Sequence, residues 1–319
     1  MFWVGSRLIQ EIMIKTISIV LTIIFFSLAL PGCVSVVDKN EAATAYFNLG
    51  NAYFELEKYN EAVNAYARAI ELDSSFERAS YNLARLYLET NRIDEGVDLL
   101  QELDRKDEGN SITLNTLAYA YTLKGEEEKA LEIYEKVLQR SPYDKNALYN
   151  TGILLWNKGD REAARRPFHS LYEIDPKDSI ILYNLGLLEI ELENREEGIK
   201  YLELYLEGKP SDTDAMIVVG DAYRDEQRYG DALENYDKVI AGGTAEPELY
   251  FKKAYILLTA IGDTEKGLEA LEQAISGEYK EKELYQQLAD DPELIEKEQI
   301  RQFLSDNGLI EEKSELEEE

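Results

Sequence analysis

The sequence repeats with a period of 34 residues from Ala43 onward, and this period constrains the fold more than any other feature. The eighth position of every block is glycine or alanine: Gly50, Ala84, Ala118, Gly152, Gly186, Gly220 and Ala254. The twenty-fourth position is always large: Tyr66, Leu100, Tyr134, Phe168, Leu202, Tyr236 and Leu271. Since the side chains at a contact set how closely two helices pack, this alternation predicts repeated helix pairs that cross at the small residue.

Turn and helix-breaking residues recur at fixed block positions. Asn91, Gly125 and Gly159 stand near position 15 and separate two helices, and proline closes three blocks at Pro142, Pro176 and Pro210. The predicted repeats cover residues 43–76, 77–110, 111–144, 145–178, 179–212, 213–246 and 247–281. The last block holds one extra residue, which we place in Ile261–Thr264.

The blocks at Tyr46–Ser75 and Leu148–Pro176 resemble the tetratricopeptide repeat (TPR) family, and the resemblance covers about residues 43–281. It implies an all-α fold, a right-handed superhelix or α-solenoid of seven helix pairs. Three residues, Thr151, Glu189 and Lys253, stand where the family usually has apolar ones. Pro167 lies within a second helix and predicts a kink.

A solenoid leaves its last apolar face bare, so a terminal cap is expected after the repeats. Residues 282–310 suit this role because Leu284, Leu288, Leu294, Ile295 and Leu304 have helical spacing, broken once at Asp291-Pro292. Residues 311–319 are strongly acidic and predict a disordered tail.

The N-terminal region predicts export and anchoring. Ile17–Leu30 is an apolar run of 14 residues, shorter than the roughly 20 that a membrane-spanning helix needs. Leu30-Pro31-Gly32-Cys33 follows and resembles the bacterial lipobox, which implies a signal peptide over residues 1–32, lipidation of Cys33 and a short tether over 33–42. The translation start could be Met13. The alternative is an uncleaved helix from Leu8 with an inert Cys33.

Composition excludes several classes of function. The chain has 64 acidic and 34 basic residues, a net charge of −30, which repels nucleic acid and anionic membranes. One cysteine and one histidine exclude an intramolecular disulfide and a Cys/His metal cluster. No catalytic motif is present, and the sequence nominates no partner for His169. We therefore expect no enzymatic activity, no cofactor and no bound metal.

In the TPR family, one face of each first helix lines the concave surface where partners dock. The candidate groove residues on this face are Phe47, Asn51, Arg78, Tyr81, Asn82, Arg85, Asn115, Tyr119, Tyr149, Asn150, Ile153, Trp156, Ile180, Tyr183, Asn184 and Leu187. Asparagine amides can bind an extended backbone, although asparagine is also common at these positions in the family. The apolar fourth and fifth repeats predict an apolar or amphipathic partner segment, unless neighbouring first helices cover one another there.

Charge varies along the predicted groove. Arg78 and Arg85 belong to the second repeat, whereas Asp214, Asp221 and Glu248 belong to the sixth and seventh. Some family members clamp a terminal carboxylate with asparagines and basic residues. Asn51 and Asn82 match that clamp, but Phe47, Ile112 and Thr116 replace its bases, so we do not predict it.

These features favour a membrane-anchored TPR lipoprotein that acts as a protein-interaction scaffold or adaptor in the bacterial cell envelope. It would face the periplasm or the exterior and bind a protein or peptide partner, not nucleic acid. The alternative is a periplasmic accessory that binds an apolar ligand or lipid, for example for a transporter.

Overall fold

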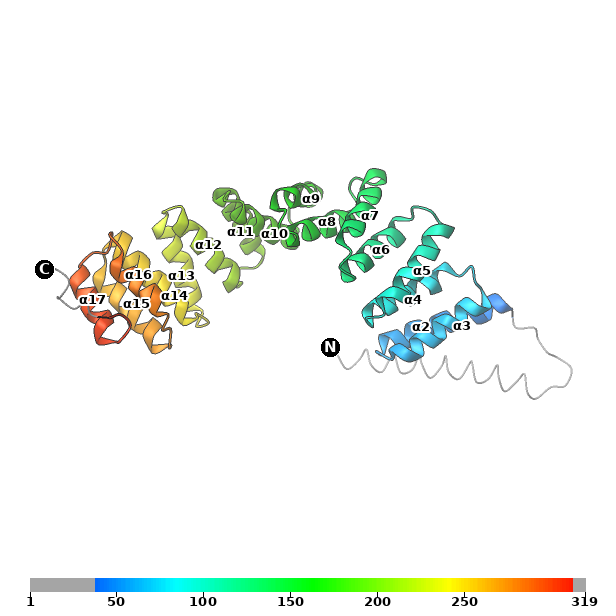
Figure 1. The fold of residues 1–319 in the computed structure, drawn as a ribbon, viewed down its shortest axis with the longest axis horizontal. Helices are drawn as coiled ribbons and strands as arrows, with labels where there is room; N and C mark the ends of the chain where they lie inside the picture. Colours follow the sequence, from blue (N-terminus) through cyan, green and yellow to red (C-terminus); the bar gives the residue numbers. More distant parts are fainter. Residues whose placement is uncertain (1–37, 312–319) are drawn as a thin grey trace. The chain divides into compact units, whose positions relative to one another are not determined.

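The computed structural model describes residues 38–311, in which all regular structure is helical (Figure 1). The predicted signal peptide, Cys33 and the tail from residue 312 onward lie outside the described residues. The chain divides into two compact units, the first ending at Leu154 and the second beginning at Leu155. None of the described helices is long and apolar enough to cross a membrane.

The first unit is a series of helix pairs, in which α2 packs on α3, α4 on α5 and α6 on α7. Its helices are α2 (Lys39–Glu55), α3 (Tyr59–Leu72), α4 (Glu77–Glu89), α5 (Ile93–Lys106), α6 (Ser111–Leu123), α7 (Glu127–Arg140) and α8 (Lys145–Asn157), of which α8 runs on into the second unit. Because α2 begins at Lys39, capped by the Asp38 carboxylate, it includes four residues, Lys39–Ala42, that were predicted to be tether.

The second unit continues the same pairing, with α10 on α11, α12 on α13 and α14 on α15. Its helices are α9 (Arg161–Ile174), α10 (Ser179–Glu191), α11 (Arg195–Gly208), α12 (Thr213–Asp225), α13 (Tyr229–Ala241), α14 (Pro247–Ile256), α15 (Thr264–Ser276), α16 (Lys282–Asp290) and α17 (Lys297–Asp306). The helix α9 continues through Pro167, which is buried inside it.

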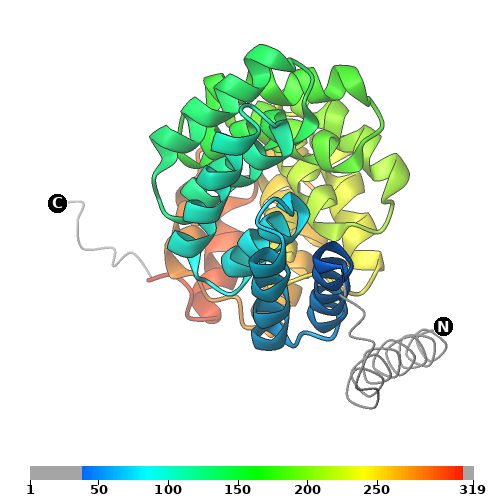
Figure 2. The same ribbon diagram turned by 90° about the vertical axis from the view of Figure 1, so that its right-hand side faces the viewer.

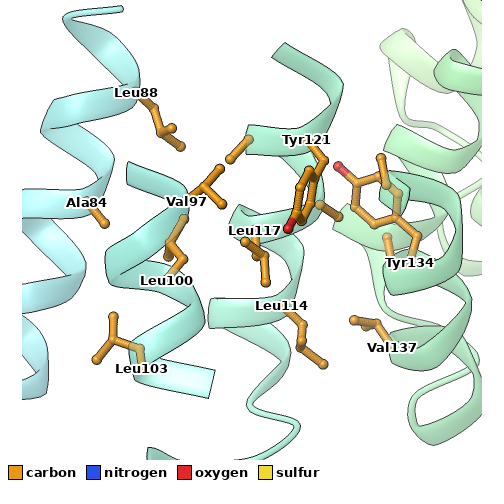
Figure 3. Packing of buried hydrophobic residues seen from close by; sticks show 14 of the residues in the cluster. Ala84, Leu88, Val97, Leu100, Leu103, Leu114, Leu117, Tyr121, Tyr134 and Val137 are labelled. Carbon is orange, nitrogen blue, oxygen red and sulfur yellow. The ribbon is translucent and has the colours of Figure 1, made fainter. Parts of the chain in front are cut away.

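The small residues at block position 8 lie where the two helices of a pair cross, as the period predicts. A Cβ atom added to Gly50 would lie 2.5 Å from the Tyr66 ring, and one added to Gly220 would lie 2.5 Å from the Tyr236 ring. Large residues fill the space around these crossings. Figure 3 shows Leu100, Leu117 and Tyr134 packed together between successive helices of the first unit.

The turn inside each pair adopts a left-handed backbone at position 15. The residue is glycine in two pairs, at Gly125 and Gly159, but Glu57, Glu193 and Gln227 also have positive φ angles of 58°, 63° and 58°. A left-handed residue of this kind is the usual end of an α-helix, where it lets the last carbonyls be satisfied.

The sequence pattern predicted the extra residue of the seventh block within Ile261–Thr264, slightly later than the structure has it. It is absorbed in a π-helical turn, η1 (Leu257–Ile261), that extends α14 and ends at Gly262, whose φ angle is 81°. A π-helical turn accommodates one added residue without breaking the helix. After this block, α16 and α17 cover the last apolar surface with Tyr285, Leu288, Ile300 and Leu304, which are fully buried.

Candidate partner-binding groove

Two adjoining cavities open along the first helices of the N-terminal unit. The smaller has a volume of about 280 Å³ and is lined by Asn51, Phe54, Glu55, Tyr66, Asn82 and Arg85. The larger has a volume of about 350 Å³ and is lined by Tyr81, Arg85, Leu88, Glu89, Ile112, Asn115, Thr116, Tyr119, Leu123, Asn146 and Asn150. Arg85 lines both cavities, so together they form one groove over α2, α4, α6 and α8.

At the first end of this groove, hydrogen bonds hold one asparagine in place. The Tyr66 hydroxyl donates to Asn51 Oδ1 at 2.7 Å, and Asn82 Nδ2 donates to the same oxygen at 2.9 Å. Burial raises the pKa of the Tyr66 hydroxyl, which therefore remains a donor. With its oxygen occupied twice, Asn51 offers a partner only the donors of its amide nitrogen.

In the larger cavity, Asn115 has an unsatisfied acceptor. Its side chain is 8% exposed, and its Nδ2 donates to Asp144 Oδ1 at 3.0 Å, but its Oδ1 has no hydrogen-bond partner. The other two buried side-chain polar atoms without partners in the described residues are the Tyr134 hydroxyl and Thr151 Oγ1, on the adjacent helices α7 and α8. An unpaired buried acceptor costs about 1–3 kcal/mol.

An exposed apolar stripe borders the same cavity. Ile112, Tyr119 and Leu123 are 64%, 45% and 44% exposed and share one face of α6, at spacings of seven and four residues. Polar groups for a backbone and apolar surface for side chains therefore lie side by side in this groove.

The arginines of the groove have local partners. Arg85 pairs with Glu89 at 3.7 Å, and the Arg78 guanidinium lies 5.0 Å from the centre of the Phe47 ring. Glu55 also lines the groove. The groove is therefore mixed in charge, and its arginines would act on an acidic partner at short range only.

Phe47 was predicted to line the groove, and this is wrong. Its side chain is only 4% exposed, and its ring centre lies 5.0 Å from that of Phe76 and 6.0 Å from that of Tyr66. Phe47, at block position 5, faces the start of α4, where Phe76 precedes the helix, so Phe47 belongs to the core of the first two repeats.

The remaining candidates differ in what surrounds them. Tyr81, Asn82, Arg85, Asn115, Tyr119 and Asn150 line the larger cavity or the smaller one, and Tyr149 and Ile153 on α8 are half-buried. In the second unit Ile180 is exposed, whereas Tyr183 packs on Tyr205 with ring centres 5.1 Å apart. Leu187 and Asn184 are half-buried, and Asn184 Nδ2 donates to the Ile180 carbonyl at 2.8 Å.

Trp156 has structural contacts of its own. Its indole Nε1 donates to Glu191 Oε2 at 2.9 Å, and its ring meets Phe168 edge-on at 6.1 Å. Both contacts lie within the second unit and hold the side chain half-buried. These contacts favour a structural role for Trp156 over a role in partner binding.

One polar cluster could not be inferred from sequence. Glu189 is fully buried and accepts hydrogen bonds from Arg165 Nε at 2.7 Å, Asn194 Nδ2 at 2.8 Å and His169 Nε2 at 3.0 Å. Burial raises the pKa of the Glu189 carboxyl, but these bonds outweigh burial and leave the pKa below its ordinary value. The single histidine is thus a partner of a structural carboxylate. Among residues 38–311, no three His, Cys, Asp or Glu residues converge as a metal site would require.

Family models match three stretches of the chain. A TPR repeat model matches residues 50–91, and tetratricopeptide repeat models match residues 113–144 and 149–213. The chain therefore contains tetratricopeptide repeats. Proteins built from this repeat are generally non-catalytic scaffolds that bind protein or peptide partners.

Similar proteins agree with this assignment. A tetratricopeptide repeat protein from Parabacteroides merdae is 19% identical, with a TM-score of 0.53 over 78% of this chain and 98% of its own, which shows the shared fold. A TPR repeat-containing protein of Methanocaldococcus jannaschii is 29% identical over 85 residues, 25% of this chain. The match spans only 27% of that relative.

Proposed function

We propose that this protein is a lipid-anchored scaffold of the bacterial cell envelope that binds an extended segment of a partner protein in the groove of its N-terminal unit. The observation that carries the binding site is the cavity over α4, α6 and α8, which Asn115, Asn146 and Asn150 line together with exposed apolar side chains. An extended peptide has an N–H donor and a carbonyl acceptor at every residue, which matches this lining. The exposed Ile112 and Tyr119 would take an apolar side chain of the same segment.

The anchoring half of the proposal depends on Cys33 and the apolar run before it. Lipidation would place the repeats on the far side of the membrane, facing the periplasm or the exterior. Metabolic labelling with a lipid precursor tests this directly. Label should enter the wild type and not Cys33→Ala, and label in that variant would refute the anchor.

Photo-cross-linking in intact cells tests the groove. A photoreactive phenylalanine analogue at Tyr119 should capture a discrete protein, whereas the same analogue at Tyr143, which is 67% exposed in the loop after α7, should not. Equal capture from both positions would argue against a groove site.

A matched pair of asparagines controls for stability. Asn150 Nδ2 donates to the carbonyl four residues earlier at 2.9 Å, and Asn184 Nδ2 does the same at 2.8 Å, but of these two only Asn150 lines the cavity. Asn150→Ala should weaken cross-linking from position 119, and Asn184→Ala should not. If both variants reduced capture alike, the loss would reflect stability and the site would be refuted.

A further inference from the structure

The first helix of the first repeat has an outer face that the other described helices cover only in part. In the second, third and fifth repeats, the fourth and seventh block positions are both buried: Ser80 and Leu83 on α4 are 5% and 4% exposed, and the preceding second helix, α3, packs on α4. The equivalent residues of α2 are Tyr46, which is 38% exposed, and Leu49, which is half-buried. Figure 2 shows α2 at the start of the first unit with α3 along its side.

This face is continuous and uncharged. Tyr46, Leu49, Tyr53 and Leu56 follow one another at spacings of three, four and three residues. Ala42, Ala45 and Ala52 lie between them, and at 100° per residue the seven side chains share an arc of about 120°. The charged residues of α2 lie outside that arc, Lys39 and Glu41 about 20° beyond its two edges and Glu55 further round, and Phe47 points the other way into the core.

The chain itself indicates what lies against this face. If Cys33 carries lipid, only Val34–Asp38 separates the membrane from the start of α2. Five residues span about 18 Å at full extension, less than the length of α2, about 25 Å for 17 residues. The helix nearest the anchor thus also has a partly exposed apolar face.

The chemistry of the face suits a bilayer surface. Tyrosine is enriched at membrane interfaces because its ring is apolar and its hydroxyl remains hydrated, and Tyr46 and Tyr53 both lie on this face. The acidic chain would be repelled by anionic lipid, but a face without acidic residues can approach zwitterionic headgroups.

We propose that the outer face of α2 rests on the lipid bilayer, which takes the place of the missing preceding repeat. This inference rests on the proposed lipid anchor at Cys33. It adds that the first repeat itself is part of the membrane contact, and that the protein is held in a defined orientation rather than on a free tether.

The test uses the full chain, acylated in cells and reconstituted into phosphatidylcholine vesicles. Since Cys33 is the only cysteine, acylation leaves no other thiol, and a single new cysteine can be labelled with an environment-sensitive fluorophore. Ala45→Cys lies on the face, and Thr44→Cys lies next to it in sequence, also exposed, but on the opposite side of α2. Spin-labelled lipid should quench the label at position 45 several-fold more strongly than the label at position 44.

The outcomes are distinguishable. Equal quenching at both positions, in protein that floats with the vesicles, would overturn the bilayer contact and leave the anchor intact. Protein that does not float would overturn the anchor and this inference together. A label at position 45 that is shielded without vesicles and released on dilution would mean that a second copy covers the face, and would also overturn the proposal. In the supporting case, Tyr46→Glu with Leu56→Glu should abolish the quenching difference while flotation persists.

Discussion

The same register positions make a neutral contact in the N-terminal unit and an ionic one in the C-terminal unit. In the first, the Tyr66 hydroxyl and the Asn82 amide both donate to Asn51. In the second, the Tyr236 hydroxyl donates to Asp221 Oδ1 at 2.6 Å, and Lys252 Nζ donates to Asp221 Oδ2 at 2.8 Å. Each set of hydrogen bonds joins block positions 9 and 24 of one repeat to block position 6 of the next.

The difference separates a surface that can bind from one that is already satisfied. Asp221 also accepts a bond from Arg224 at 3.3 Å, so its charge is balanced within the unit. Glu189 is satisfied in the same manner by three donors. In the N-terminal unit, by contrast, the amides keep unused donors and acceptors and line open cavities. Neutral amides therefore keep hydrogen-bonding groups for a partner, whereas the paired charges already bond to groups within their own unit.

The largest expected effect follows from the buried carboxylate of the C-terminal unit. Glu189→Ala takes one of two carboxylate partners from Arg165, which keeps Glu197 at 3.3 Å, and removes the acceptor of Asn194 and His169. We expect the free energy of unfolding of that unit to fall by about 2–3 kcal/mol, because a buried hydrogen-bonded side chain is lost. Denaturant unfolding followed by Trp156 fluorescence measures it, since Trp156 lies in this unit. The control is Glu89→Ala, a half-exposed partner of Arg85, which should change stability by less than about 1 kcal/mol. Equal effects would remove the distinction between the two units.

Overpacking should affect both units alike. Gly50→Ala and Gly220→Ala each place a methyl group 2.5 Å from the ring of the position-24 tyrosine. Because the helix crossing is the same, we expect each to lower stability by about 2 kcal/mol despite the different polar contacts nearby. Hydrogen exchange resolved by helix would assign each loss to its own unit. Gly125→Ala is not a suitable control, because the φ angle there is 76°, whereas Gly230→Ala meets nothing within 4 Å and should be nearly neutral.

Exchanging the acid at position 221 and the amide at position 51 should have unequal effects on stability. Asp221→Asn removes one carboxylate partner each from Lys252 and Arg224, which keep Glu248 and Asp225, and we expect a loss of about 1 kcal/mol. Asn51→Asp should stay within about 0.5 kcal/mol, because both groups that face the Asn51 oxygen are donors and an acid accepts from them equally well. Thermal unfolding of the two variants tests this. Equal losses would show that charge is not what distinguishes the two sites.

Acid should destabilise the C-terminal unit first. Burial raises the pKa of the Glu189 carboxyl, but its hydrogen bonds lower that pKa by more. The Tyr205 hydroxyl and the Ala215 amide lower the pKa of Asp212. A carboxyl whose pKa is lowered by folding contributes stability that is present above its unfolded pKa and is lost as the pH falls through the folded value. Between about pH 5 and pH 3, Trp156 fluorescence should therefore change before hydrogen exchange accelerates in α4–α6. The reverse order would contradict this prediction.

The smallest effect concerns the turns, where the two units should not differ. Glu57→Gly and Gln227→Gly each relieve a left-handed backbone with φ 58°, which disfavours side chains. Since glycine also gains entropy in the unfolded chain, the net stabilisation should be only about 0.5 kcal/mol. Differential scanning calorimetry would show a slight rise in the unfolding temperature. A fall would mean that the glutamate or glutamine side chain contributes more than the strain removes.

The cap shows how far pattern alone can go. The spacing correctly placed helices after the seventh repeat, and Leu288 and Leu304 are fully buried there as expected. Yet Ile295 is 43% exposed, while Tyr285 and Ile300, which were not selected, are fully buried. The break at Asp291-Pro292 separates two short helices, and a periodicity carried across such a break loses its phase.

The position-24 tyrosines show a second limit. The period identified Tyr66 and Tyr236 as core residues, which they are, but it did not reveal that their hydroxyls reach the groove side. The available signal was the pairing of tyrosine at position 24 with asparagine or aspartate at position 9. Phe47 was misplaced for a related reason, since the expected groove stripe took no account of Phe76 before α4.

The sequence by itself determined the helix pairs, their register and the small residues at their crossings, because these follow from local periodicity and side-chain volume. Only the tertiary structure decided which polar groups are satisfied. Asn115 and Glu189 both stand on the first helices of their repeats, yet one keeps an unpaired oxygen and the other accepts three bonds. Their partners come from neighbouring helices or turns, at distances and angles that no spacing in the sequence specifies.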